Sequence, residues 1–262
     1  MKRIALLISF FLVSPAVYPC LILVFTADNR VIIGNHEDWP ARDARIRFLP
    51  GDEHKLGAVV FDFESEGLIQ GGVNSSGLFF DGTATPFVPI DFADKEEFIG
   101  KDFWLSLLQT CHNVQEAVVF VDRYKVPELE QVHILFADRS GQSVIVGAYD
   151  GKLTHTWKKQ PYQVLTNFNI VDPEYGGEQP CPRFATATRI LSGPSKDPME
   201  TARRVLEETT QGQLTVYSTL FDLSAGVFSI YYTADFGRSL RYSIADELKR
   251  GPHNVLLSQE LR

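Results

Sequence analysis

Cys20 is the residue with the clearest capacity for chemistry. It follows a segment typical of a secretory signal and directly precedes a strand-like run, residues 21–26. If the nineteen residues before it are removed, Cys20 becomes the first residue of the mature protein. An N-terminal cysteine carries a thiol nucleophile and a free α-amino group, and the amine can act as the base for the thiol. The position of Cys20 therefore predicts a catalytic pair on one residue.

The segment before Cys20 predicts export. A charged start, Met1-Lys2-Arg3, is followed by the apolar residues 4–13, a run shorter than the ~20 residues of a membrane-spanning helix. A small-x-small pattern ending at Ala16 suits signal peptidase. We expect residues 1–19 to be a signal peptide, cut after Ala16, plus a short propeptide that Cys20 itself could remove. The mature chain is then secreted or periplasmic, with no stable membrane anchor.

Two other interpretations of Cys20 remain open from these residues alone. One is a lipoprotein cysteine, although Tyr18 and Pro19 fit poorly where a lipobox has a small residue before the cysteine. The other is a structural cysteine near a ragged mature N-terminus. If Cys111 and Cys181 form a disulfide in an exported protein, Cys20 is left as the free thiol. The sequence does not give their separation.

Composition indicates a globular, acidic protein. Hydrophobic residues make up 44% of the chain, and the net charge is −8 with no basic cluster. This charge argues against nucleic acid as a partner. We see no repeat, low-complexity linker or clear boundary, and we expect residues 20–262 to form one domain.

The elements that would position Cys20 begin with β structure. Residues 21–26 and 30–34 flank a polar turn, Ala27-Asp28-Asn29, and form a hairpin that starts at Cys20. Further strands are expected at 56–63, 68–72, 77–81, 131–137, 143–149, 153–157, 218–222 and 227–232.

Helices separate these groups of strands. Residues 98–111 have apolar residues at helical spacing, Asn113 with Glu116 resembles a capping box, and Asp197-Pro198 opens a helix to about Thr210. Strict βαβ alternation is absent. The order β, α, β, α, β therefore predicts an α+β fold with antiparallel sheets.

Five blocks of the sequence, in order, resemble the choloylglycine hydrolase and penicillin V acylase family. They are Cys20 with Gly34-Asn35-His36-Glu37-Asp38-Trp39, Gly72-Val73-Asn74-Ser75-Ser76-Gly77-Leu78, Val164-Leu165-Thr166-Asn167, Pro182-Arg183-Phe184, and Thr215 to Thr219 with Ser229 to Tyr232. Members of this family are N-terminal-nucleophile (Ntn) hydrolases that cleave linear amides. The resemblance implies an αββα sandwich, two antiparallel sheets between layers of helices.

The resemblance also implies a role for four residues. Cys20 Sγ attacks the amide carbon and forms a thioester, Asp38 holds the freed α-amine, Asn167 donates to the oxyanion, and Arg183 supplies a fixed positive charge. The plainer alternatives are a turn or cap for Asp38, a loop asparagine after a strand, and an arginine at a helix start.

Two positions depart from the family pattern. Asn35 stands where the family usually has arginine, and Ala84, beside Thr83, stands where a second oxyanion residue is expected. A backbone N–H of Thr83 or Ala84 remains as a replacement donor.

Other candidate groups have plainer explanations. His36, Glu37 and His133 show no metal-ligand spacing, and we expect them to be structural. Aromatic residues that could line an acyl pocket, or simply form core, are Phe79, Phe80, Phe87, Trp104 and Phe168.

The sequence therefore predicts a hydrolase of a non-peptide linear amide. The family includes enzymes for phenoxyacyl penicillins, conjugated bile salts, fatty-acyl amides and acyl-homoserine lactones, and the sequence does not choose among them. No cofactor or metal is implied, and the partner is a small acyl amide. Alternatives are an acyltransferase and a non-catalytic periplasmic protein that keeps the fold. A homo-oligomer is also open, since related enzymes are often tetramers.

Overall fold

The structure is a computed structural model that describes residues 20–172 and 181–261. The expected signal peptide and propeptide, residues 1–19, lie outside the described residues.

The described strands form two sheets in which every paired neighbour is antiparallel. The 6-stranded sheet has the order β10 (Tyr162–Leu165), β1 (Leu21–Ala27), β2 (Arg30–Asp38), β11 (Thr215–Asp222), β12 (Val227–Tyr232), β13 (Leu240–Ser243). The 8-stranded sheet has the order β14 (His253–Leu256), β3 (Ala44–Leu49), β4 (Ala58–Phe63), β5 (Ile69–Asn74), β6 (Phe79–Ala84), β7 (Val132–Ala137), β8 (Ser143–Tyr149), β9 (Lys152–Trp157).

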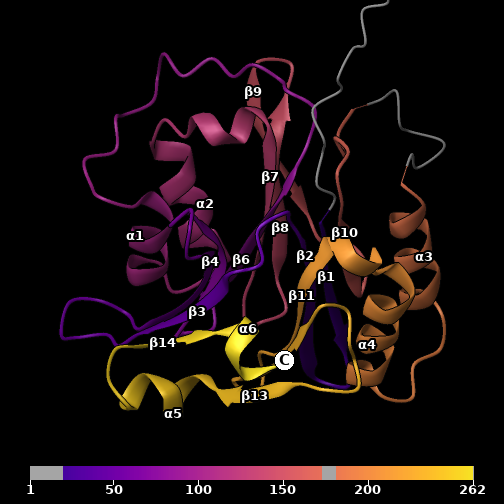
Figure 1. Cartoon of the computed structure of the whole chain (residues 1–262). Helices are drawn as coiled ribbons and strands as arrows, with labels where there is room; N and C mark the ends of the chain where they lie inside the picture. The colour runs from indigo at the N-terminus through magenta and orange to yellow at the C-terminus, as the bar shows by residue number, and fades with distance from the viewer. Residues whose placement is uncertain (1–19, 173–180, 262) are drawn as a thin grey trace, which may run out of the picture.

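Four of the described helices cover the outer faces of the two sheets: α1 (Phe103–Thr110), α2 (Val114–Arg123), α3 (Pro182–Leu191) and α4 (Pro198–Thr209). Two short helices, α5 (Ile244–Lys249) and α6 (Leu257–Glu260), pack against the core between the sheets. In Figure 1, α1 and α2 lie on one side of the paired sheets and α3 and α4 on the other. The predicted α+β class and the αββα order of layers are therefore confirmed. No described helix is both long enough and apolar enough to cross a membrane.

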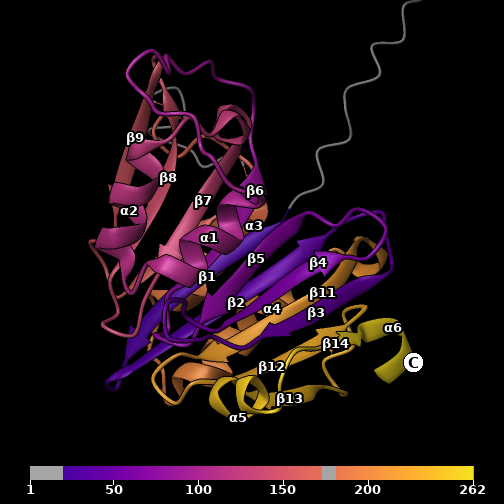
Figure 2. The ribbon, with the colours of Figure 1, turned by 90° about the vertical axis from the view of Figure 1, so that its left-hand side faces the viewer.

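Each interface between layers has its own hydrophobic core. Ile22 and Val24 of β1 pack between the two sheets, because their side chains alternate with Leu21 and Leu23, which pack against α3 and α4. A third core joins the 8-stranded sheet to α1 and α2. Figure 2 views the sheets from the side of α1 and α2; the core that contains Ile22 and Val24 lies between the two sheets. The strand bearing Cys20 is thus packed on both faces.

The hairpin that begins at Cys20 forms as predicted. Asp28 and Asn29 have φ values of 51° and 58° and make the two-residue turn, a conformation that Asn and Asp tolerate better than most residues. β2 continues past the predicted end to Asp38. This extension places the whole motif from Gly34 to Asp38 on one strand.

Helix boundaries follow their capping residues. The helix expected over 98–111 begins at Phe103, because the Asp102 side chain accepts from the Leu105 backbone N–H. Asn113 caps α2 as predicted and accepts from Glu116 N–H, whereas the Glu116 carboxylate accepts from His112 N–H. Several elements were not predicted: β3, β10, β13, β14, α3, α5 and α6.

We expect Leu206→Ala to lower the free energy of unfolding by about 2–5 kcal/mol, because it removes a fully buried side chain at the α4–β2 contact. Leu206 Cδ2 would come within 3.2 Å of a Cβ at Gly34, so the residues fit closely. Urea unfolding measures the change. Arg204→Ala on the exposed side of α4 is the control and should change stability by less than about 0.5 kcal/mol. Equal effects of the two substitutions would contradict this packing.

Candidate active site

Cys20 lies at the start of β1 and faces the space between the sheets. The antiparallel register pairs Leu21 with His36 and Ile22 with Asn35, so Cys20 lies opposite Glu37. Its Sγ is 3.7 Å from Glu37 Oε1, and the residue is 5% exposed. Burial, and then the Glu37 charge, raise the pKa of the Cys20 thiol well above its usual value, while the Asp38 backbone N–H acts in the opposite direction. In the described chain, whose Cys20 nitrogen is in a peptide bond, the protonated thiol is therefore favoured.

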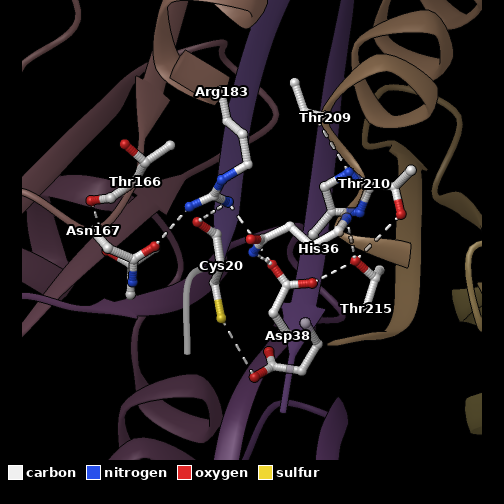
Figure 3. A network of polar contacts seen from close by, with 12 residues as sticks. Cys20, His36, Asp38, Thr166, Asn167, Arg183, Thr209, Thr210 and Thr215 are labelled. Atoms are coloured by element: carbon white, nitrogen blue, oxygen red, sulfur yellow. Dashed lines mark hydrogen bonds and ion pairs between the residues drawn. The ribbon is translucent and has the colours of Figure 1, made fainter. Parts of the chain in front are cut away.

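Arg183 connects the other predicted site residues to Cys20. It lies in the first turn of α3, where Pro182 is at a position that favours a helix start. Its Nη1 donates to the Cys20 carbonyl at 2.9 Å, and its Nη2 donates to Asn167 Oδ1 at 3.1 Å. The same Nη1 is 3.8 Å from Asp38 Oδ2. Figure 3 shows the guanidinium group between these three residues.

The structure thus brings Cys20, Asp38, Asn167 and Arg183 together from four separate segments. Cys20 precedes β1, Asp38 ends β2, Asn167 follows β10, and Arg183 begins α3. Two hydrogen bonds and one ion contact fix the orientation of the Arg183 guanidinium group, which offers several donors in a rigid plane.

Asp38 is held by hydroxyl and amide donors. Thr215 Oγ1 donates to Oδ1 and Gln211 Nε2 donates to Oδ2 at 2.7 Å. Burial raises the pKa of Asp38, and the two donors and the Arg183 charge oppose that effect. The carboxyl group therefore has a fixed orientation beside the backbone of Cys20.

The proposed oxyanion residues also meet. Asn167 Nδ2 donates to the Ala84 carbonyl at 2.8 Å, and Thr83 Oγ1 donates to the Thr166 carbonyl at 3.2 Å. The end of β6 and the segment after β10 are therefore tied together beside Cys20. In this structure the Asn167 amide contacts a backbone oxygen of the chain itself.

The aromatic candidates do not form one pocket. Phe79 packs between the sheets against Phe221, whereas Phe80 packs on the opposite face of β6 against Trp104 of α1. Because neighbouring residues of a strand point to opposite faces, these rings cannot line a single surface. Phe87 is 63% exposed in the segment after β6. The prediction was wrong for Phe80 and Trp104, which lie on the α1 side of the sheet, away from Cys20.

Phe168 is the aromatic candidate that lies next to a site residue. It follows Asn167, is buried, and packs edge-to-face against Phe184 at 5.2 Å between ring centroids. Phe184 in turn follows Arg183. The pair therefore supports the two segments that carry the asparagine and the arginine.

His36 has the structural role that we expected. Its Nδ1 contacts Ser218 Oγ, and its Nε2 contacts the Leu206 carbonyl and Thr209 Oγ1 of α4. Burial lowers the pKa of His36 to about 3, so the neutral ring joins β2 to α4. His133 is buried in β7 as expected, but its Nδ1 has no hydrogen-bond partner among the described residues.

Asp81 is a residue of the site that our sequence analysis missed, and Glu37 is one that we expected to be structural. Both are buried, and both carboxyl groups have pKa values well above their usual range because they are desolvated; the Asp81 charge raises that of Glu37 further. Asn35 Nδ2 donates to Asp81 Oδ2, and the Gly82 N–H donates to Asp81 Oδ1 at 2.7 Å. Strand alternation was the available signal, since it places Asn35 and Glu37 on the face of β2 that Cys20 shares.

The possible Cys111–Cys181 disulfide is not present. All three cysteines lie in the described part of the chain, and each is a free thiol. Cys111 ends α1, whereas Cys181 precedes α3 on the other side of the two sheets, so the fold separates them.

Within residues 20–172 and 181–261, no three His, Cys, Asp or Glu side chains cluster as metal ligands would.

Comparisons with known structures identify the fold. The chain matches penicillin V acylase from Agrobacterium tumefaciens with a TM-score of 0.68 and 17% identity, over 91% of each chain. It has the Ntn-hydrolase fold. A conjugated bile acid hydrolase mutant from Clostridium perfringens gives a TM-score of 0.61 at 14% identity, over 90% of this chain and 96% of that one.

A third structure extends the same resemblance. The Caenorhabditis elegans ortholog of N-acylethanolamine-hydrolyzing acid amidase gives a TM-score of 0.58 at 14% identity, over 90% of this chain and 100% of that one. The sequence itself matches no family model and no curated protein. The predicted resemblance to linear amide hydrolases of the Ntn fold is thus confirmed at the level of structure.

The neutral state of His36 predicts an acid-dependent loss of stability. The unfolded chain binds a proton on this ring below its ordinary pKa of about 6.5, whereas the folded chain does so only near 3. Between these values the free energy of unfolding should fall with decreasing pH by up to about 1.4 kcal/mol per pH unit. Urea unfolding from pH 4 to 7 measures this.

His36→Gln removes the titrating ring and provides the comparison. Other titrating groups are shared, so the difference between the two pH profiles isolates His36. We expect the variant to show the shallower profile. Parallel profiles, or an NMR titration of His36 with a midpoint near its ordinary value, would contradict the burial argument.

Proposed function

We propose that this protein hydrolyses a linear N-acyl amide, with Cys20 as the nucleophile. The observation that carries the proposal is the Arg183 guanidinium group, which connects the Cys20 carbonyl to Asn167 and Asp38. The family resemblance implies a role for each of these residues, and the fold brings them together. A non-catalytic role would not require their convergence from separate elements.

The proposed chemistry begins with removal of the segment before Cys20. The new α-amino group has an ordinary pKa of about 7.7–8.0, so it can take the thiol proton near neutral pH. The thiolate attacks the amide carbon, the leaving nitrogen receives the proton, and the acyl group remains on Sγ as a thioester. Water then attacks the thioester and releases the acid.

The surrounding residues have separate tasks in this reaction. Asp38, oriented by Thr215 and Gln211, lies where it can hold the α-amine. The Arg183 charge favours the thiolate and the oxyanion. The Asn167 amide must turn from the Ala84 carbonyl toward the substrate oxygen, and substrate binding beside Ala84 would drive that exchange.

What the similar structures share supports the proposed substrate class. They are described as a penicillin V acylase, a conjugated bile acid hydrolase and an N-acylethanolamine-hydrolyzing amidase. Penicillin V, conjugated bile acids and N-acylethanolamines each contain an acyl group on a nitrogen that is not part of a peptide chain. We propose the same bond for this protein, and export through residues 1–19.

A non-catalytic protein of the same fold is the second candidate. Asn35 in place of arginine and Ala84 in place of a side-chain donor favour it, as does the raised pKa of the Cys20 thiol. Thiol labelling discriminates between the two. A catalytic Cys20 in mature protein reacts with iodoacetamide near neutral pH much faster than Cys111, whose pKa burial raises to about 12.

Cys20→Ala should abolish hydrolysis of acyl amides and leave the preceding segment attached. Mass spectrometry of purified wild-type protein should find Cys20 at its N-terminus. The substrate panel would vary acyl length and aromatic content. Cys111→Ala is the matched control and should retain both cleavage and turnover. Full hydrolysis by the Cys20→Ala protein, or mature wild-type protein that keeps Tyr18 and Pro19, would rule the proposal out.

Asn167→Ala should lower kcat by about 10²–10³-fold with a smaller change in KM, as expected for loss of an oxyanion donor. Steady-state kinetics on the best substrate of the panel measures both constants. Asn254→Ala, at an exposed position of β14, is the control and should leave them unchanged. A change confined to KM would assign Asn167 to substrate binding instead.

A further inference from the structure

Cys20 lacks its proposed base while the preceding segment is attached. Its nitrogen is then part of the Pro19–Cys20 peptide bond and has no free electron pair to accept a proton. The first cut at this bond therefore needs a different base for the thiol. Glu37 is the residue whose side chain contacts Sγ among the described hydrogen bonds, at 3.7 Å.

We propose that Glu37 accepts the Cys20 thiol proton in the uncut chain and so enables Cys20 to release its own α-amino group. This inference rests on the proposed function only in requiring that Cys20 become N-terminal. It assigns to Glu37 a role in maturation that ends when the amine appears.

The fold holds Glu37 in place for this contact. Glu37 is 2% exposed and lies on the central strand β2, between Cys20 on one side and Tyr217 of β11 on the other. Its Oε2 has no hydrogen-bond partner among the described residues. The Glu37 carboxyl group is thus buried beside Sγ, one of its oxygens has no described hydrogen-bond donor, and no described cation neutralises its charge.

Hydrogen bonds distinguish the two carboxyl groups of the site. Asp81 accepts from Asn35 and from the Gly82 N–H, whereas Glu37 accepts only from the thiol among the described contacts. The Asp81 charge, which has more hydrogen-bond donors, therefore forms first and raises the pKa of Glu37, so that Glu37 loses its proton at higher pH. The titratable groups that act on Glu37 or lie against it are the Cys20 thiol, Asp81, Asp38, Glu66 and Tyr217.

The raised basicity of Glu37 suits proton transfer from a thiol. Burial and the charges of Asp81 and Asp38 raise the pKa of Glu37 well above its usual range, which makes its carboxylate a stronger base than that of an ordinary glutamate. General-base catalysis is efficient when the base approaches the acidity of the group that it deprotonates. An exposed glutamate would be too weak a base.

The cleavage balances with water as the co-reactant. Sγ passes its proton to Glu37 and attacks the Pro19 carbonyl carbon. The bond from that carbon to the Cys20 nitrogen breaks, and the nitrogen takes the proton back from Glu37. The acyl group now forms a thioester on Sγ. Water adds to its carbonyl carbon, so that Pro19 gains a carboxyl group and Sγ regains a proton.

The first test follows release of residues 1–19 from the full chain. Cell-free translation without membranes supplies the chain in the absence of signal peptidase, and mass spectrometry follows the cut before Cys20 over time. Glu37→Gln should slow release by about 10²-fold or more. Glu208→Gln, the same change at an exposed site on α4, should release at the wild-type rate, and Cys20→Ala should not release at all.

The second test is the pH dependence of release, which a merely structural role would not produce. The wild-type rate should rise with pH as Glu37 loses its proton. Asp81→Asn removes the neighbouring charge, so it should shift this rise to lower pH, and Glu37→Gln should abolish it. Thermal unfolding confirms that each variant is folded; if Glu37→Gln does not fold, the Asp81→Asn shift decides.

Three results would overturn the inference: release by Glu37→Gln within twofold of the wild-type rate, a wild-type full chain that does not release, or an Asp81→Asn profile that does not move. No amide substrate is needed for either readout. A chain that releases as expected but hydrolyses no acyl amide would therefore refute the proposed function and leave the role of Glu37 standing.

Discussion

The antiparallel register of β1 and β2 is the constraint on which the site depends. Because side chains alternate along a strand, the pairing of Leu21 with His36 puts Asn35 and Glu37 between the sheets with Cys20, and directs His36 toward α4. A shift of one residue would exchange these two sets. The buried faces on both sides of β2 make such a shift costly, so the two-residue turn at Asp28 and Asn29 and the hydrophobic cores enforce the same pairing.

That register also places several acidic side chains around Cys20. Glu37, Asp38 and Asp81 all act on the Cys20 thiol, and each of them raises its pKa through its charge. Arg183 is placed at the opposite side, on the backbone carbonyl of Cys20 and close to Asp38. The site can therefore hold Asp38 ionised beside Arg183, while Glu37, beside the Asp81 charge, keeps its proton to higher pH. The protonation state of Glu37 thus controls whether it can accept the proton of the Cys20 thiol.

Sequence reasoning predicted the parts of this arrangement that depend on local pattern. The hairpin after Cys20, the Asn113 cap and the helix opened by Pro198 follow from turn and capping chemistry, and the order of the elements gave the layers once the family resemblance was included. The strand β3 was missed although its apolar residues alternate with Arg45 and Arg47, as in a strand with one buried face; these arginines pair with the buried Asp62 of the adjacent strand. Such ion pairs join two neighbouring strands, and a local sequence pattern does not show which residues of the two strands will meet.

The residues of the site also differ in how far the sequence could predict them. The roles of Cys20, Asp38, Asn167 and Arg183 follow from the family resemblance, which assigns roles residue by residue and gives none to positions where this sequence differs from the family. Glu37 and Asp81 have no such assignment, and their importance appears only when two sheets are brought face to face. Phe80 was misplaced for the opposite reason, since an aromatic residue beside a motif was given a role before the face of its strand was known.

The replacement of arginine by Asn35 has a physical connection to the buried acids. A cation at position 35 would stabilise the ionised forms of both Glu37 and Asp81, and the pKa of Glu37 would then fall toward that of an ordinary carboxylate. Such a group would be a poor acceptor for a thiol proton. Asn35 instead donates a neutral hydrogen bond to Asp81, which satisfies that carboxylate without cancelling its charge on Glu37. The departure at position 35 therefore preserves the basicity of the carboxyl group that touches Sγ, and the two features act together.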